Sequence, residues 1–187
     1  MTDEQLKWQL KGSMELLKTP VFTVKSLHEE AAGGVEGDYI RLDAPECVVM
    51  IPEYGGDFVL VRQWRHGAAR LTTEFPGGVI GKGEAPEAAA YRELYEETGF
   101  KAGRLKLLGS VNPNPALFLS RFYVFLATEL TPTGVLHPDS DELISVETRP
   151  IGEVLASYGS EEFCHAFMGT ALAFYLRDKA SRTGEPD

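Results

Sequence analysis

The chain has few cysteines, no long apolar run, and fewer basic than acidic residues. Its two cysteines, Cys47 and Cys164, lie far apart in the sequence, which argues against a local redox pair or a metal knuckle. Both stand in apolar segments, so we expect buried free thiols in a reducing compartment. No stretch approaches the roughly 18 apolar residues that a membrane span requires, and the charged N-terminal segment lacks the apolar core of a secretion signal. These absences predict a cytoplasmic protein with no membrane partner.

The charge balance disfavours a nucleic acid as partner. The 187 residues include 28 acidic and 18 basic ones, for a formal net charge of -10. Such a chain has no broad electrostatic attraction for a phosphate backbone, so local groups or metal ions must hold any phosphate that it binds. Hydrophobic residues at 43% and charged residues at 25% are typical of an ordinary globular domain.

The first part of the chain is predicted to form an appendage. Apolar residues recur at helical spacing at Leu6, Leu10 and Met14, which favours an amphipathic helix over residues 2–18. Two β-like stretches around a glycine-containing turn predict a hairpin within residues 21–42. A helix and a hairpin have little core of their own, so we expect residues 1–45 to pair with a second copy of the chain in a homodimer.

Residues 46–187 are expected to form the main domain. Strand-like segments alternate there with two helices, expected at about 84–98 and 160–177. A run of strands with helices on its faces predicts an α/β or an α+β sandwich. The strand-like segments are residues 47–52, 58–64, 71–75, 104–111, 121–130 and 143–149.

The helix at 84–98 carries an unusual group of carboxylates near its C-terminal end. Glu93 and Glu97 share one face, and Glu96 lies on its flank. Like charges at this spacing repel one another, and the negative end of the helix dipole adds to the cost. Arg92 can pair with Glu96 but cannot neutralise three carboxylates. A divalent ion could, and hard oxygen ligands favour Mg²⁺ or Mn²⁺.

The residues around this helix resemble the Nudix box. The pattern is Gly78, five residues, Glu84, seven residues, and then RELYEETGF at residues 92–100. The resemblance implies a Nudix-type α/β/α sandwich with a mixed sheet, in addition to the small N-terminal helix-and-hairpin appendage. It also implies metal-dependent hydrolysis of a nucleoside diphosphate linked to another group.

The same resemblance implies roles for individual residues. Glu93 and Glu97 would be the principal ligands of Mg²⁺ or Mn²⁺, Glu96 a further direct or water-mediated one, and the carbonyl of Gly77 another. Arg92 and Glu84 would orient this cluster.

Within the family the chain looks most like the pyrophosphatases that act on ADP-ribose and nucleoside diphosphate sugars. The likeness rests on the N-terminal appendage, on Arg65 and Glu74 in segments ahead of the box, and on Pro115 beyond it. The planar fork of Arg65 suits a phosphate or a terminal ribose, although a plain surface arginine is an equal alternative. Pro115 equally fits a loop proline that rigidifies a turn. Trp64 or Tyr39 could stack on a base, although core packing is the commoner role of an aromatic residue in a strand.

The resemblance also suggests a general base in the acidic loop after the box. We expect Glu142 to take this role, with Asp141 and Asp139 as alternatives to it. An acidic, solvated turn is the other interpretation of these residues.

Two other functions stay open at this stage. One is hydrolysis of a different diphosphate, such as a nucleoside triphosphate, a dinucleoside polyphosphate, coenzyme A or an RNA 5′ end. The other is a catalytically silent nucleotide-binding regulator, which the intact box disfavours.

Overall fold

The computed structural model describes residues 1–135 and 143–183, which divide into two compact units. The N-terminal unit comprises residues 1–46 and 112–121, and the main unit comprises residues 47–111 and the described residues from 122 onward.

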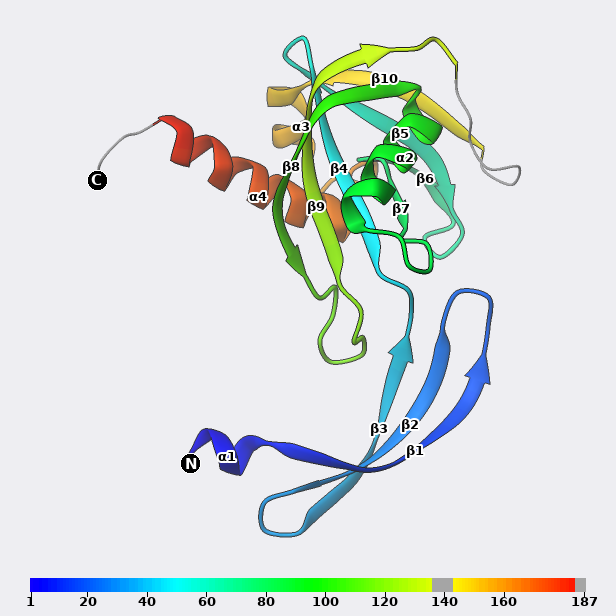
Figure 1. Cartoon of the computed structure of the whole chain (residues 1–187), viewed down its shortest axis with the longest axis vertical. Helices are drawn as coiled ribbons and strands as arrows, with labels where there is room; N and C mark the ends of the chain where they lie inside the picture. Colours follow the sequence, from blue (N-terminus) through cyan, green and yellow to red (C-terminus); the bar gives the residue numbers. More distant parts are fainter. Residues whose placement is uncertain (136–142, 184–187) are drawn as a thin grey trace. The chain divides into compact units, whose positions relative to one another are not determined.

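The N-terminal unit is a three-stranded antiparallel sheet preceded by a single helical turn, α1 (Asp3–Leu6) (Figure 1). Its strands lie in the order β1-β2-β3. They are β1 (Trp8–Lys18), β2 (Thr23–Ala31) and β3 (Val35–Asp43). The antiparallel pairing of β2 with β3 confirms the hairpin that the sequence predicts. The segment 112–121 joins this unit through Leu42, whose N–H donates to the carbonyl of Leu117 over 2.8 Å.

The predicted helix over residues 2–18 is wrong beyond Leu6, because residues 8–18 form strand β1. The pairing of β1 with β2 shifts register between Leu10 and Gly12 and again between Glu15 and Leu17. The apolar residues at helical spacing are exposed, at 54% for Leu10 and 62% for Met14, so their spacing marks no buried helix face. Pairing with β2 therefore determines that residues 8–18 form a strand, and the helical spacing of their apolar residues gives the wrong prediction.

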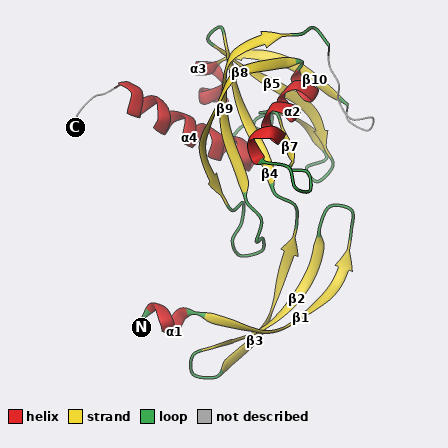
Figure 2. Cartoon of the chain, in the orientation of Figure 1, coloured by secondary structure: helices red, strands yellow, loops and turns green. Residues whose placement is uncertain are grey.

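The main unit has a mixed sheet in the order β10-β5-β4-β9-β8, with β6 on β5 and β7 on β4. The β4–β9 pair is parallel and the other pairs are antiparallel. The strands are β4 (Cys47–Tyr54), β5 (Asp57–Arg65), β6 (Arg70–Glu74), β7 (Gly77–Val79), β8 (Phe100–Val111), β9 (Phe122–Pro132) and β10 (Ile144–Pro150). The helices are α2 (Pro86–Thr98), α3 (Ile151–Ser157) and α4 (Ala166–Thr183), drawn in red in Figure 2.

Helices cover both faces of this sheet. Along β4, Val48 and Met50 pack in a core with Leu94 of α2. The alternate residues of β4 pack on the other face with Val154 of α3 and Met168 of α4. This alternation confirms the predicted α/β/α sandwich, because successive side chains of a strand point to opposite faces.

Two local expectations need correction at the C-terminal end of the main unit. Helix α4 begins at Ala166 and not near residue 160, and residues 158–165 form a connection after α3. Cys164 is exposed in this connection, because its neighbour Phe163 takes the core position with 2% exposure. Cys47 is half-buried. Within residues 1–135 and 143–183, no helix is long and apolar enough to cross a membrane.

Candidate active site

Helix α2 is fixed at both ends and along its inner face. Pro86 occupies the first helical turn, where its missing N–H costs nothing. Gly99 ends the helix in the left-handed conformation, at φ 69°, and its N–H donates to the carbonyl of Tyr95 over 2.9 Å. Ala89, Ala90 and Leu94 are fully buried. The helix is therefore held so that its acidic residues meet the loop and strand at β7.

Two glycines let the backbone at β7 approach its neighbours closely. The N–H of Gly77 donates to Oε2 of Glu97 over 2.8 Å, and Glu97 is only 3% exposed. A Cβ atom on Gly77 would lie 2.3 Å from the carbonyl oxygen of Val48 in β4. A Cβ atom on Gly78 would lie 2.3 Å from the carboxylate carbon of Glu93. Only glycine at these two positions allows both carboxylates to lie against the strand.

Arg92 holds the remaining carboxylates of the box. Its Nη1 donates to Glu93 Oε1 over 2.7 Å and to Glu96 Oε2 over 3.1 Å. Its Nε and Nη2 donate to the two oxygens of Glu84, each over 2.9 Å, and Nη2 also donates to the carbonyl of Val79 over 3.1 Å. The predicted Arg92–Glu96 pair is thus confirmed, as one part of a larger network.

The bidentate pair with Arg92 lowers the pKa of Glu84 to about 2, and the N–H of Gly81 contributes to this shift. The same carboxylate is the main reason that the pKa of Arg92 is raised above its ordinary value, and Glu93 and Glu96 act in the same direction. The guanidinium therefore stays charged and keeps its orientation among the carboxylates.

The donor set of this cluster suits a divalent cation. Glu93 and Glu96 both present an oxygen to one guanidinium nitrogen, so a positive group already lies between them. The hydrogen bond between Glu97 and the Gly77 N–H places the Glu97 carboxylate beside the Gly77 backbone. Carboxylate and carbonyl oxygens are ligands that Mg²⁺ accepts. In the described part of the chain, no three His, Cys, Asp or Glu side chains form a preassembled metal site. The carboxylates contact Arg92 and the Gly77 amide instead.

Arg65 and Glu74, which the sequence suggests as substrate-binding residues, form a pair. Arg65 Nε donates to Glu74 Oε1 over 2.7 Å, and Nη2 donates to Oε2 over 2.8 Å. Glu74 is 3% exposed, and Thr72 also donates to its Oε1, over 2.9 Å. The side chain of Arg65 remains 41% exposed. Because Glu74 precedes Gly77 by three residues, one short segment connects this pair to the carboxylate cluster.

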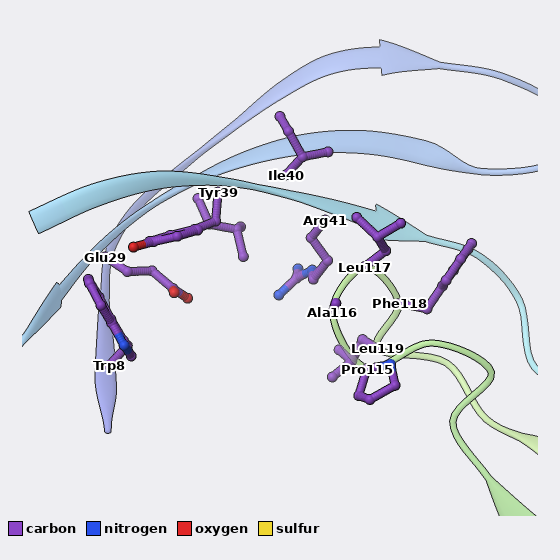
Figure 3. A pocket seen from close by; sticks show the side chains of 11 residues that line it. Trp8, Glu29, Tyr39, Ile40, Arg41, Pro115, Ala116, Leu117, Phe118 and Leu119 are labelled. Atoms are coloured by element: carbon purple, nitrogen blue, oxygen red, sulfur yellow. The ribbon is translucent and has the colours of Figure 1, made fainter. Parts of the chain in front are cut away.

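Pro115 lies in the N-terminal unit, at the edge of a pocket of about 430 Å³ (Figure 3). The rings of Trp8 and Tyr39 meet edge to face there, with centroids 5.2 Å apart. Glu29 and Arg41 supply charged groups of both signs to the same lining. Sequence reasoning missed Trp8, Glu29 and Arg41, because the pairing of three strands brings them together without a sequence motif. Glu142, Asp141 and Asp139 lie outside the described residues.

Comparison with known proteins identifies the class to which this arrangement belongs. Residues 44–166 match the NUDIX domain, and the chain therefore belongs to the Nudix family. The ADP compounds hydrolase NudE of Escherichia coli (strain K12) is 29% identical over 163 residues, which cover 86% of this chain and 87% of that protein. The ADP-ribose pyrophosphatase of Bacillus subtilis (strain 168) is 32% identical over 120 residues, or 64% of this chain and 65% of that one.

A solved structure agrees with this assignment over nearly the whole chain. The crystal structure of an ADP compounds hydrolase matches with a TM-score of 0.85 at 26% identity, covering 98% of this chain and 99% of that one. The family that the residues at 78–100 suggest is confirmed. The branch that the N-terminal appendage, Arg65, Glu74 and Pro115 suggest is confirmed as well.

We expect Gly78→Ala to weaken the binding of a divalent ion. The added methyl group would overlap the Glu93 carboxylate and force it out of its position. Calorimetry with Mn²⁺ should show affinity reduced by roughly tenfold or more, as for the loss of one ligand's orientation. Gly67→Ala is the control, because a Cβ atom there meets nothing within 4 Å. Equal Mn²⁺ affinity in the two variants would contradict this account of Gly78.

The Glu84–Arg92 pair should also give the stability a specific dependence on pH. Because the pKa of Glu84 falls from its ordinary value of 4.5 to about 2 in the folded chain, ionised Glu84 stabilises the fold above pH 4.5. That contribution is lost as the pH falls from 4.5 toward 2. The free energies of unfolding of the wild type and of Glu84→Gln, measured by urea denaturation at a series of pH values, should therefore converge as the pH falls through this interval. A constant difference at all pH values would show that Glu84 is not held by Arg92.

Proposed function

We propose that the chain hydrolyses the diphosphate of ADP-ribose or of a related nucleoside diphosphate sugar, giving a nucleoside monophosphate and a sugar phosphate. The observation that carries the proposal is the carboxylate cluster of α2, held by Arg92 and by the Gly77 amide. The names of the relatives support the substrate class. They include an ADP-sugar pyrophosphatase of Mus musculus, 46% identical over 59 residues that cover 32% of this chain and 27% of that one.

The chemistry requires positive charge beside the diphosphate, a water molecule and an acceptor for its proton. In this proposal Glu93, Glu96, Glu97 and the carbonyl of Gly77 hold Mg²⁺ or Mn²⁺. When bound, such an ion neutralises the diphosphate and makes a nearby water more acidic. One water is consumed: its oxygen bonds to one phosphorus, and the bond from that phosphorus to the bridging oxygen breaks.

The remaining residues orient the reactants. Arg92 and Glu84 keep the carboxylates in position, because the bidentate contact between them fixes the guanidinium. Arg65 is held by Glu74 through Nε and Nη2, and its side chain is 41% exposed, so the rest of the guanidinium can contact a phosphate or the terminal ribose. Pro115 contributes to substrate binding through the pocket that it lines in the N-terminal unit.

We assign the proton acceptor to Glu142 on sequence grounds. The acidic sequence at residues 137–142 follows the box, and a carboxylate there can accept the proton of the attacking water. Asp141 and Asp139 are the alternatives. A cytoplasmic location likewise stays a prediction from the sequence.

A substrate panel tests the activity. We expect Mg²⁺-dependent release of nucleoside monophosphate from ADP-ribose and ADP-glucose, with a higher kcat/KM than for dGTP or a diadenosine polyphosphate. Glu97→Gln should lower kcat by at least about a hundredfold, as expected when a metal ligand is lost. Glu142→Gln should lower kcat by about a hundredfold if it is the base.

Glu87→Gln is the matched control for this panel, because Glu87 is exposed in the first turn of the same helix. We expect it to keep the wild-type kcat. Near-normal turnover of Glu97→Gln would contradict the ligand assignment. A higher kcat/KM for a nucleoside triphosphate than for ADP-ribose would contradict the proposed substrate class and indicate another Nudix activity.

We further propose that the chain forms a homodimer through the N-terminal unit. Strand β1 lies at the edge of its sheet and exposes large apolar side chains, among them Leu10 (54%), Met14 (62%) and Leu17 (56%). A long apolar edge strand is a template for pairing with another chain. A second copy, whose own β1 offers the same edge, satisfies both chains by one symmetric contact.

Sedimentation tests this assembly. The wild type should sediment at about twice the 20.6 kDa chain mass at micromolar concentration. The double variant Leu10→Lys/Met14→Lys should shift toward single chains, because two buried charges would disfavour the contact. Leu107→Lys, at an exposed leucine of the main unit, should leave the mass unchanged. A wild type of single chains at this concentration would overturn the homodimer.

A further inference from the structure

The connection between α3 and α4 is anchored on strand β6 beside Glu74. The N–H of Thr73 donates to the carbonyl of Glu162 over 2.9 Å. The carboxylate of Glu162 accepts from the Thr73 hydroxyl over 2.9 Å and from Arg62 Nη1 over 2.6 Å. Backbone and side chain of Glu162 thus fix this connection to β5 and β6. His165, three residues further on, is brought to the buried carboxylate of Glu74.

The imidazole ring of His165 is held by the first turn of α4. Its Nδ1 accepts a hydrogen bond from the N–H of Phe167 over 3.2 Å. The ring also meets the Phe167 ring edge to face at 5.0 Å, and Phe167 in turn stacks on Phe122 at 4.2 Å. These contacts set both the position of the ring and the role of its Nδ1 atom.

The opposite nitrogen of this ring faces Glu74. His165 Nε2 lies 3.5 Å from Glu74 Oε2. Burial lowers the pKa of His165, and Arg65 adds to the decrease while Glu74 opposes it, so the ring is neutral at pH 7. Because Nδ1 is an acceptor, the neutral ring carries its hydrogen on Nε2, toward the carboxylate.

Glu74 is consequently restrained from several sides. Its Oε1 accepts from Thr72 and from Arg65, and its Oε2 accepts from Arg65 and faces His165. A carboxylate restrained in this way fixes the plane of the guanidinium that it binds, because the bidentate contact has one geometry. The exposed side of Arg65 is then oriented before any ligand arrives, which favours binding of an anion.

We propose that His165 is a positioning residue, which acts through Glu74 to hold the guanidinium of Arg65 in the orientation that binds the anionic substrate. The inference deepens the proposed function and rests on it, since Arg65 is assigned there to a phosphate or the terminal ribose. It assigns His165 no part in the chemical step. Removing its contact with Glu74 should therefore raise KM and leave kcat unchanged.

Two substitutions separate the two nitrogens of the ring. In His165→Asn, the amide oxygen can replace Nδ1 as the acceptor for Phe167, but the side chain ends short of Glu74. In His165→Gln, the longer side chain can bring its amide nitrogen to the place of Nε2. We expect His165→Asn to raise KM for ADP-ribose roughly tenfold, a size typical of coupled polar groups, with kcat within about twofold of wild type. His165→Gln should restore KM to within about threefold of the wild-type value.

A binding measurement accompanies the kinetics. The Kd of ADP-ribose, measured by calorimetry in EDTA, should rise with KM in His165→Asn, and the melting temperature should stay at the wild-type value. In a Glu74→Gln background, His165→Asn should have no further effect on Kd, because its route to Arg65 is already broken. His28→Asn, at an exposed histidine of the N-terminal unit, is the matched control and should change neither KM nor Kd.

The outcomes separate this inference from the proposed function. A wild type that does not hydrolyse nucleoside diphosphate sugars overturns the proposed function. A wild type that does, with unchanged KM and Kd in His165→Asn, overturns the role of His165 alone. Equal increases in the Asn and Gln variants, or additive effects with Glu74→Gln, also overturn it. If His165→Asn does not fold, His165→Leu, which has a similar volume, replaces it in the same cycle.

Discussion

Mutual repulsion among the carboxylates of α2 is the constraint on which the site depends. Glu93, Glu96 and Glu97 lie within about one turn at the negative end of the helix dipole, where each ionised group disfavours the others. Arg92 relieves part of this repulsion through Glu93 and Glu96, and the Gly77 amide relieves another part through Glu97. Negative charge still exceeds positive charge, because Arg92 also binds Glu84. Such a cluster is stabilised further by any divalent ion or cationic group that enters it.

Residues whose structure depends on near neighbours could be predicted from the sequence. Pro86 and Gly99 bound α2 by local rules, and period-two patterns located most strands. The box residues could be predicted because their spacing along one helix decides which face they share. Strand β1 could not, since its pairing with β2 overrides a helical spacing of leucines. A local pattern is reliable only where no distant partner competes with it.

Contacts between distant segments were the part of the site that the sequence could not supply. Arg65 and Glu74 could be nominated separately, but their pairing depends on the register of β5 against β6. His165 belongs to no sequence motif. It lies beside Glu74 only because Glu162 anchors the connection between α3 and α4 on Thr73. The pocket of the N-terminal unit is similar: its lining combines β1, β2, β3 and residues 115–119. Sequence patterns identify the groups that supply charge, whereas the fold identifies the groups that orient them.

The short segment from Glu74 to Gly78 links these two kinds of residue. Glu74 is buried, and a buried carboxylate is costly unless it is paired and hydrogen-bonded, which Arg65 and Thr72 accomplish. Three residues later, Gly77 and Gly78 set how closely the backbone approaches Glu97 and Glu93. Because the strands on either side of Phe75 and Pro76 pair with different neighbours, β6 with β5 and β7 with β4, each end of the segment is fixed independently. Glu74, which orients Arg65, and Gly77 and Gly78, which shape the carboxylate cluster, are therefore close in sequence. Different strand pairs nevertheless hold them in place.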